Sequence, residues 1–153
     1  MSSVLKNLQA RLNNKAGVLV DSNVLLDIAT NDVNWSEWSA NALAECAEHA
    51  ALLINPIIYA EVSVGFSTIE ALDAALPGQI YRREALPWEA GFLAGKSLLV
   101  YRKRGGARNT PLPDFYIGAH AAIENLALLT RDAVRYQTYF AGIEVLSPES
   151  GQR

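Results

Sequence analysis

Four acidic residues lie at the edge of apolar stretches of the sequence, or inside them, where a charge is costly to bury. They are Asp21, Glu61, Asp114 and Asp132. A carboxylate taken out of water costs several kcal/mol unless a positive charge compensates it. A divalent cation shared by these side chains would supply that charge. Because all the donors are oxygens and the sequence has no cysteine or histidine cluster, the pattern predicts one or two Mg²⁺ or Mn²⁺ ions.

Glu61 is the most informative of the four, because it lies in the middle of an apolar helical segment. Isoleucine, valine and glycine occupy the positions three and four residues away on either side, so the segment offers Glu61 no basic partner. The segment is apolar nearly all round, which predicts a buried helix. A glutamate there must be protonated, paired with a distant residue or bound to a metal ion.

Each of the three aspartates also has a purely structural interpretation. Asp21 and Asp132 could cap the helices that follow them, and Asp114 falls in the first turn of its helix. Acidic side chains at helix N-termini stabilise those helices by roughly 0.3–2 kcal/mol without any active site. The metal hypothesis therefore depends on Glu61 and on the fold bringing all four acids together.

Short apolar strands alternate with longer helical segments along the chain. The expected strands span residues 17–20, 52–54, 80–86, 126–130 and 143–146. The expected helices span residues 21–29, 36–50, 56–66, 68–76, 87–104, 113–125 and 131–140, with Ser36, Asn55 and either Ser67 or Thr68 as N-caps. This alternation predicts a parallel sheet covered by helices on both faces. Ligands of such sheets bind beyond the carboxyl ends of the strands, where Asp21 and Asp132 are expected.

Length and composition indicate one folded domain in a reducing compartment. The chain has 153 residues, half of them apolar, which is enough for a substantial core. No apolar stretch approaches the roughly 18 residues of a membrane span, and the N-terminus does not resemble a signal peptide. The single cysteine, Cys46, excludes an internal disulfide and is expected to be a core thiol. A cytoplasmic protein without membrane contact is expected.

Charge is distributed unevenly along the chain. No basic residue occurs between Lys15 and Arg82, whereas residues 82–108 hold seven basic residues and two acidic ones. The acidic part could hold cations or meet a basic partner, and the basic segment could contact phosphates. Both could equally be solvated surfaces.

Three polar residues close to the acids are candidates for a supporting role. Ser22 and Asn23 follow Asp21, and Thr130 precedes Asp132 by two positions. Their side chains could fix the turns or hold a water near the metal, although turn and strand-end residues of these types are common in any protein. His120 is expected to be packed or hydrogen-bonded rather than catalytic.

Four segments around the acids together resemble the signature blocks of PIN-domain nucleases. They are residues 20–25, 59–62, 112–121 and 129–132. The chain is most similar to the small VapC-type toxins of bacterial toxin–antitoxin pairs, over about residues 17–146. It departs from them in residues 1–16, because such toxins usually start almost at the first strand. Asp27 matches a position that is less regular in the family, so it is expected at most to support the site.

The resemblance implies a three-layer α/β/α fold with a central parallel sheet, in a domain spanning residues 17–147. A helical extension at residues 1–16 would precede it, and a short tail at residues 148–153 would follow. The implied activity is metal-dependent endoribonucleolytic cleavage by a homodimeric toxin that a cognate antitoxin inhibits. Asp21, Asp114 and Asp132 would hold the metal, and Glu61 would bind a second ion or orient the attacking water. The candidates for RNA contact are Arg82, Arg83, Lys96, Arg102, Lys103, Arg104 and Arg108.

Two other functions remain open on the sequence alone. A Mg²⁺-dependent phosphatase or phospho-acceptor domain also places aspartates after strands. It requires a catalytic lysine near the end of a late strand, and no lysine follows Lys103. A non-catalytic PIN-like regulatory protein would keep the fold without the activity.

Overall fold

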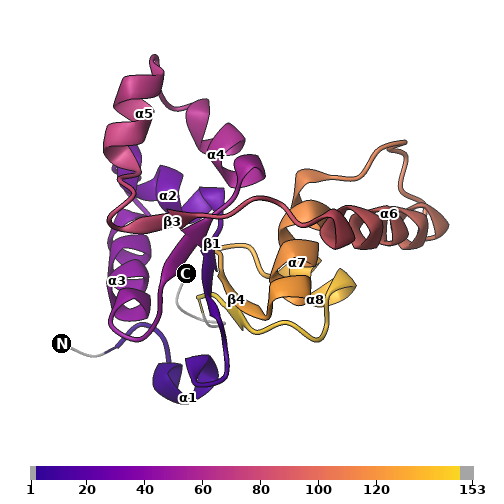
Figure 1. Cartoon of the computed structure of the whole chain (residues 1–153), viewed down its shortest axis with the longest axis horizontal. Helices are drawn as coiled ribbons and strands as arrows, with labels where there is room; N and C mark the ends of the chain where they lie inside the picture. The colour runs from indigo at the N-terminus through magenta and orange to yellow at the C-terminus, as the bar shows by residue number, and fades with distance from the viewer. Residues whose placement is uncertain (1–2, 149–153) are drawn as a thin grey trace.

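Five parallel strands form the central sheet of the protein, whose computed structural model describes residues 3–148 (Figure 1). The strands are β1 (Gly17–Val20), β2 (Leu52–Ile54), β3 (Tyr81–Arg83), β4 (Leu126–Leu129) and β5 (Val145–Leu146). Their order in the sheet is β3-β2-β1-β4-β5, and every neighbouring pair is parallel. Parallel strands require crossover connections, which cover the faces of the sheet. The predicted α/β class is confirmed.

Helices connect these strands and complete the layers on either side of the sheet. They are α1 (Leu8–Leu12), α2 (Ser22–Ala29), α3 (Ser36–Ala47), α4 (Pro56–Ser63), α5 (Ile69–Ala75), α6 (Trp88–Lys103), α7 (Pro113–Glu124) and α8 (Val134–Tyr139). Helices α2 and α3 lie on one side of the sheet and α7 and α8 on the other, while α6 projects away from the sheet (Figure 1). Within residues 3–148, no helix has both the length and the apolar character of a membrane span.

The order of the strands reverses beside β1, and this reversal defines where a ligand can bind. The chain moves outward from β1 to β2 and β3, then returns to the other side for β4 and β5. Such a switch point leaves a crevice at the carboxyl ends of the strands. Extending the observed registers just past the strand ends aligns four side chains along this edge, namely Glu84, Asn55, Asp21 and Thr130.

Helix starts confirm two of the three predicted caps. Asn55 Oδ1 accepts a hydrogen bond from the Ile58 backbone N–H at 2.9 Å, with Pro56 next in the chain, and Thr68 caps α5 in the same way. Ser36 is not the cap of α3. The N-cap of α3 is Trp35, which makes no side-chain cap hydrogen bond, and the Asp32 carboxylate fixes the turn before the helix by accepting from the backbone N–H groups of Asn34 and Trp35.

Several predicted boundaries were too wide, and one predicted environment was wrong. The third strand is limited to Tyr81–Arg83, the last strand to Val145–Leu146, and α8 begins only at Val134. The helix that carries Glu61 is not buried all round. Its Pro56 and Ala60 face solvent, and Val64 just after it is 83% exposed. Helix α4, although its sequence is mostly apolar, lies at the surface of the molecule and is buried on one side only.

The N-terminal segment before β1 is packed into the core. Leu5, Leu8 and Leu12 are all buried. Arg11 forms an ion pair with Glu144 and also donates to the Val145 carbonyl at 2.8 Å, which ties the segment to the short edge strand β5.

Two buried polar groups behave as the sequence predicted. His120 is 1% exposed, and its Nδ1 lies 2.9 Å from the Asn55 side-chain amide nitrogen. Burial lowers the pKa of His120, so its imidazole is neutral near pH 7. Burial raises the pKa of the Cys46 thiol to about 12, which makes it an inert core residue.

Replacing Leu8 by alanine tests whether the N-terminal segment stabilises the domain. Because Leu8 is 6% exposed, we expect the variant to lose about 2–5 kcal/mol of unfolding free energy in a urea titration. Leu99→Ala on α6 is the matched control, since Leu99 is 50% exposed and should change stability by less than about 0.5 kcal/mol. Equal effects of the two substitutions would show that the segment does not belong to the core.

Candidate active site

Asp21 is the centre of the candidate site, at the carboxyl end of β1. It is the N-cap of α2 and is 4% exposed. Its Oδ1 accepts a hydrogen bond from the Ser22 backbone N–H at 2.8 Å, and its Oδ2 accepts one from Thr130 Oγ1 at 2.8 Å. Burial raises the pKa of Asp21, and the carboxylate of Asp114 raises it further. No basic side chain of residues 3–148 pairs with it.

Tyr136 connects Asp21 with Asp114, and the sequence analysis missed this residue. Its hydroxyl oxygen lies 3.0 Å from Asp21 Oδ2 and 3.2 Å from Asp114 Oδ1, so these two carboxylate oxygens are no more than 6.2 Å apart. A phenol has one proton and can donate to one carboxylate at a time, so the second contact is favourable when that carboxyl itself carries a proton. Burial raises the pKa of Tyr136 well above its usual value, and both carboxylates add to the rise.

Glu61 approaches this pair from α4. It is half-buried, and Ser22 Oγ donates a hydrogen bond to its Oε1 at 2.9 Å. Burial raises the pKa of Glu61, and the charges of Asp21 and Asp114 raise it further. Within the described part of the chain, no lysine or arginine forms an ion pair with Glu61. The long-range basic partner that the sequence left open is therefore not found among these residues.

Asp114 and Asp132 lie toward the outside of the site. Asp114 is in the first turn of α7, and burial raises its pKa, to which the charge of Asp132 contributes. Arg135 Nη1 lies 3.5 Å from Asp114 Oδ2, a long contact that lowers this pKa only in part. Asp132 is exposed, and it does not cap α8, whose N-cap is Ala133.

Thr130 and Asn23 hold the ends of β1 and β4 together beneath the acids. Thr130 Oγ1 donates to Asp21 and accepts from the Asn23 side-chain amide and from the Asp132 backbone N–H, both at 3.1 Å. The hydroxyl thus uses its one donor and two acceptor positions. Asn23 Oδ1 accepts in turn from the Arg131 backbone N–H at 3.1 Å. All three supporting residues that the sequence suggested, Ser22 included, are in contact with the site.

Asp27 lies outside this group, because it is paired with a basic side chain of its own. Arg131 binds Asp27 through two nitrogens, at 2.6 and 3.0 Å, and Ser39 Oγ donates to the same carboxylate at 2.8 Å. A buried carboxylate with a bidentate guanidinium partner is a structural ion pair. Among the described residues, Arg131 forms its ion pair with Asp27 and not with the neighbouring Asp132.

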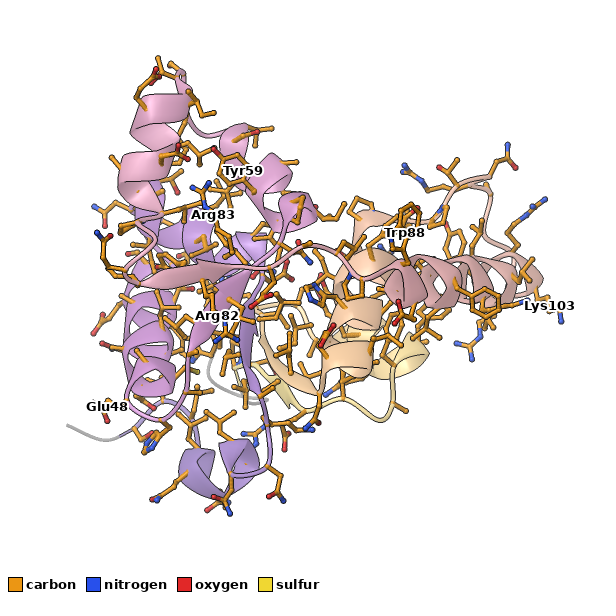
Figure 2. All side chains as sticks on the ribbon, in the orientation of Figure 1. Glu48, Tyr59, Arg82, Arg83, Trp88 and Lys103 are labelled. Carbon is orange, nitrogen blue, oxygen red and sulfur yellow. The ribbon has the colours of Figure 1, made fainter. Side chains whose placement is uncertain are left out.

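The seven basic residues proposed for RNA contact do not form one surface. Arg82 and Arg83 lie on β3, and Lys103 lies at the far end of α6 (Figure 2). Arg82 is paired with Glu84, and Arg83 with Asp73. The other members of the set lie along α6 or just after it, where Lys96 Nζ lies 5.0 Å from the Phe92 ring centre and Arg104 Cζ 5.4 Å from that of Tyr139. The remaining three, all exposed, are Arg102, Lys103 and Arg108.

The oxygen atoms around Asp21 suit a hard cation, but they do not enclose it. Hydroxyl oxygens of Thr130 and Tyr136 contact Asp21, and burial, followed by the charges of neighbouring carboxylates, raises the pKa values of Asp21, Glu61 and Asp114, an effect that a bound cation would oppose. In the part of the chain that the structure describes, however, no three acidic, histidine or cysteine side chains converge as ligands of one ion. Mg²⁺ commonly uses one or two carboxylates and fills its other positions with waters and substrate phosphates. Asp21 and Asp114 are the pair best placed for that arrangement.

The fold is that of proteins found in toxin–antitoxin complexes. A chain of VapBC2 from Rickettsia felis, in a structure bound to a promoter DNA fragment, matches with a TM-score of 0.64 and 17% identity, covering 86% of this chain and 98% of that one. VapBC-1 from nontypeable Haemophilus influenzae matches with a TM-score of 0.61 and 19% identity, over 85% and 96% of the two chains. A toxin–antitoxin complex from Klebsiella pneumoniae gives 0.59 and 22% identity, over 87% and 98%.

These similarities establish a shared fold, which confirms the three-layer PIN-like architecture expected from the sequence. No protein-family model matches the chain. No curated protein matches it either. At identities of 17–22%, the similarities extend to the fold and not to the chemistry of this chain.

Replacing Glu61 by glutamine tests whether burial and the neighbouring carboxylates raise the pKa of Glu61. A raised folded-state pKa means that the protonated acid contributes stability below its unfolded pKa, near 4.3, and that this contribution is lost as the pH rises through the folded pKa. Glutamine does not titrate, so in EDTA the variant should match the wild type at pH 4 and be more stable at pH 7.5. Solvent screening limits the gain to about 1 kcal/mol, or about 2–4 °C in Tm. A Tm difference between the variant and the wild type that stays constant across this pH range would contradict a raised pKa of Glu61.

Tyr136→Phe tests the bridging hydroxyl. Hydrogen bonds from Tyr136 lower the pKa values of Asp21 and Asp114 against the larger effect of burial. Their removal should therefore raise both values further, as measured by carboxyl-carbon NMR titration in EDTA. The pKa of Asp73, which is outside the site, should not move. Unchanged values for Asp21 and Asp114 would show that the hydroxyl does not bridge them in solution.

Proposed function

We propose that this protein is a Mg²⁺- or Mn²⁺-dependent endoribonuclease and the toxin of a toxin–antitoxin pair. The observation that supports the activity most strongly is the position of Asp21. It is buried at the switch point of a parallel sheet, it is electrostatically coupled to Asp114, and Glu61 is coupled to both. Structural ion pairs elsewhere in this chain use arginine, as at Asp27. Among the described residues, Asp21 and Glu61 have no such partner, and Asp114 has only the long contact from Arg135 at 3.5 Å.

The residues of the site suit hydrolysis of a phosphodiester. Asp21 and Asp114 would hold the cation, with Asp132 at the outer edge. When bound, the cation lowers the pKa of a coordinated water and stabilises charge on the phosphoryl oxygens. Ser22 fixes the Glu61 carboxylate, which would orient the attacking water. In-line attack of that water on phosphorus would expel the ribose O3′, leaving a 5′-phosphate and a 3′-hydroxyl.

The proposed partners follow from the fold. The structural neighbours are described as toxin–antitoxin complexes, so an antitoxin that binds and inhibits this chain is proposed. Homodimerisation is proposed from the resemblance of the sequence to VapC-type toxins, and a role in the cytoplasm from its single cysteine. RNA is proposed as the substrate. The exposed lysine and arginine side chains of α6 and of the loop after it would make salt-dependent contacts to the RNA backbone.

Asp114→Asn tests the activity. The substitution keeps the side-chain shape and removes one charge, so we expect the protein to fold. Its Mn²⁺-dependent cleavage of a structured RNA should fall by about 100-fold or more. Changing a residue that only hydrogen-bonds to a metal ligand typically costs about 10–100-fold. Glu124→Gln is the control, because Glu124 is an exposed acid at the other end of the same helix, and it should cleave like the wild type. Persistent cleavage by Asp114→Asn would refute the assignment.

A thermal-shift titration with Mn²⁺ separates the rival functions. Cation binding to the folded state should raise the Tm of the wild type with increasing Mn²⁺, and less so for Asp114→Asn. Stabilisation without cleavage of any RNA tested would favour a non-catalytic protein. Release of phosphate from a small phosphomonoester, with RNA left intact, would favour a phosphatase.

A further inference from the structure

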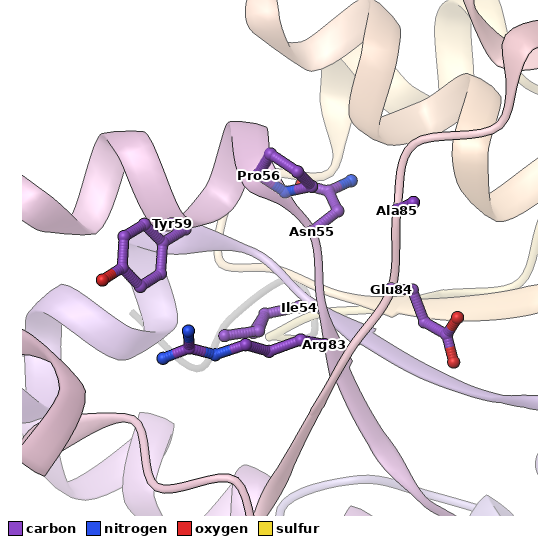
Figure 3. A pocket seen from close by; sticks show the side chains of 7 residues that line it. All are labelled: Ile54, Asn55, Pro56, Tyr59, Arg83, Glu84 and Ala85. Atoms are coloured by element: carbon purple, nitrogen blue, oxygen red, sulfur yellow. The ribbon is translucent and has the colours of Figure 1, made fainter.

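A pocket of about 280 Å³ opens between α4 and β3, beside the candidate active site (Figure 3). Its walls are mostly apolar. Ile54 and Pro56 form one part of the lining and Ala85 another, and the side chains of Tyr59 and Arg83 lie close together at one side of the pocket. This volume is slightly below the range of pockets that hold drug-sized ligands, roughly 300–1,000 Å³, so the pocket suits a smaller group.

The pocket lies close to Asp21 by the construction of the sheet. Asn55 and Glu84, which also line the pocket, are the residues aligned with Asp21 just past the ends of β2 and of β3, the next strand outward. Adjacent strands are about 4.8 Å apart. The pocket therefore begins one strand away from the buried carboxylate and continues across the next strand. A nucleotide whose phosphate lies at Asp21 could place a neighbouring base there.

A three-residue contact orients two side chains of this pocket. The Arg83 guanidinium carbon lies 4.9 Å from the centre of the Tyr59 ring. Asp73 fixes both partners, because it accepts a hydrogen bond from the Tyr59 hydroxyl at 2.6 Å and one from Arg83 Nη2 at 2.8 Å. Side chains held in one conformation lose little entropy when a ligand binds. Aromatic rings and guanidinium planes are also the groups on which unpaired RNA bases stack.

We propose that this pocket binds an unpaired base of the RNA substrate, stacked against the Tyr59–Arg83 pair. The inference deepens the proposed function and rests on it for the identity of the substrate. It assigns Arg83 to base stacking, whereas the basic residues of α6 and its following loop would contact the backbone. Stacking is tolerant of sequence, because every base has a flat aromatic face. The pocket would thus position single-stranded RNA with a modest preference among bases.

The test measures binding of a fluorescent single-stranded uridine hexamer in EDTA, where no metal-dependent cleavage occurs. Fluorescence anisotropy should show about tenfold weaker binding for Tyr59→Ala, since one stacked base contributes about 1–3 kcal/mol. Tyr59→Phe keeps the ring but loses the hydrogen bond to Asp73, so its affinity should fall less than that of Tyr59→Ala. Phe92→Ala is the matched control, because Phe92 also carries a cation over its ring, Lys96, but lies outside the pocket. It should leave the affinity unchanged.

A hexamer with abasic sugars separates stacking from backbone contacts. The wild type and Tyr59→Ala should bind this hexamer equally weakly, because it offers no base to stack on Tyr59. If Tyr59→Ala weakens both hexamers by the same factor, or weakens neither, the proposal is overturned. An unchanged RNA affinity would leave the pocket free for a different partner, such as a protein side chain.

Cross-linking in the wild type covers the case in which Tyr59→Ala does not fold. A hexamer containing 5-iodouridine, irradiated on the intact protein, should attach to the peptide that carries Tyr59. Attachment elsewhere alone would overturn the proposal. Because neither assay depends on cleavage, a protein that binds bases in this pocket but cuts no RNA would refute the nuclease and leave the pocket assignment standing.

Discussion

Uncompensated negative charge at the end of β1 is the constraint on which the site depends. The protein does not avoid pairing its acids, since arginines bind Asp27 and Asp73 at 2.6 and 2.8 Å. At Asp21 it supplies hydrogen bonds from neutral groups instead. Such donors orient a carboxylate without cancelling its charge, and burial together with mutual repulsion then raises its pKa. A site in this condition gains free energy from any cation that it can bind.

The fold explains why this charge accumulates at one place. Reversal of the strand order between β1 and β4 brings Asp21 beside Thr130, and α4 and α7 deliver Glu61 and Asp114 to the same edge. Tyr136 then occupies the space between two carboxylates with a single proton. A phenol that donates to one acid at a time stabilises the pair less than a divalent cation would. The hydroxyl is therefore suited to orient the two acids, but it does not cancel their negative charge as a cation would.

The sequence predicted much of this arrangement, because burial leaves clear patterns. Strands such as Leu126–Leu129 are short apolar runs, and Asn55 followed by Pro56 is a strong helix start, so the α/β class and most element positions were accessible. The environment of Glu61 was mispredicted, because an apolar sequence does not say which side of a helix meets solvent. Tyr136 was missed for a related reason: its role arises from contact with residues more than 20 positions away, which no local pattern encodes. The pairing of Arg131 with Asp27, rather than with the adjacent Asp132, likewise depends on tertiary structure.

The most direct test of the central claim is a crystal structure of the wild type grown near neutral pH with saturating Mn²⁺, using the anomalous signal of manganese to locate the ion. The acids of the site are expected to be ionised in the presence of the metal. The account predicts an anomalous peak within coordination distance, about 2.0–2.6 Å, of carboxylate oxygens of Asp21 or Asp114. Manganese bound elsewhere, with an arginine or lysine turned into the site to neutralise these acids, would contradict it.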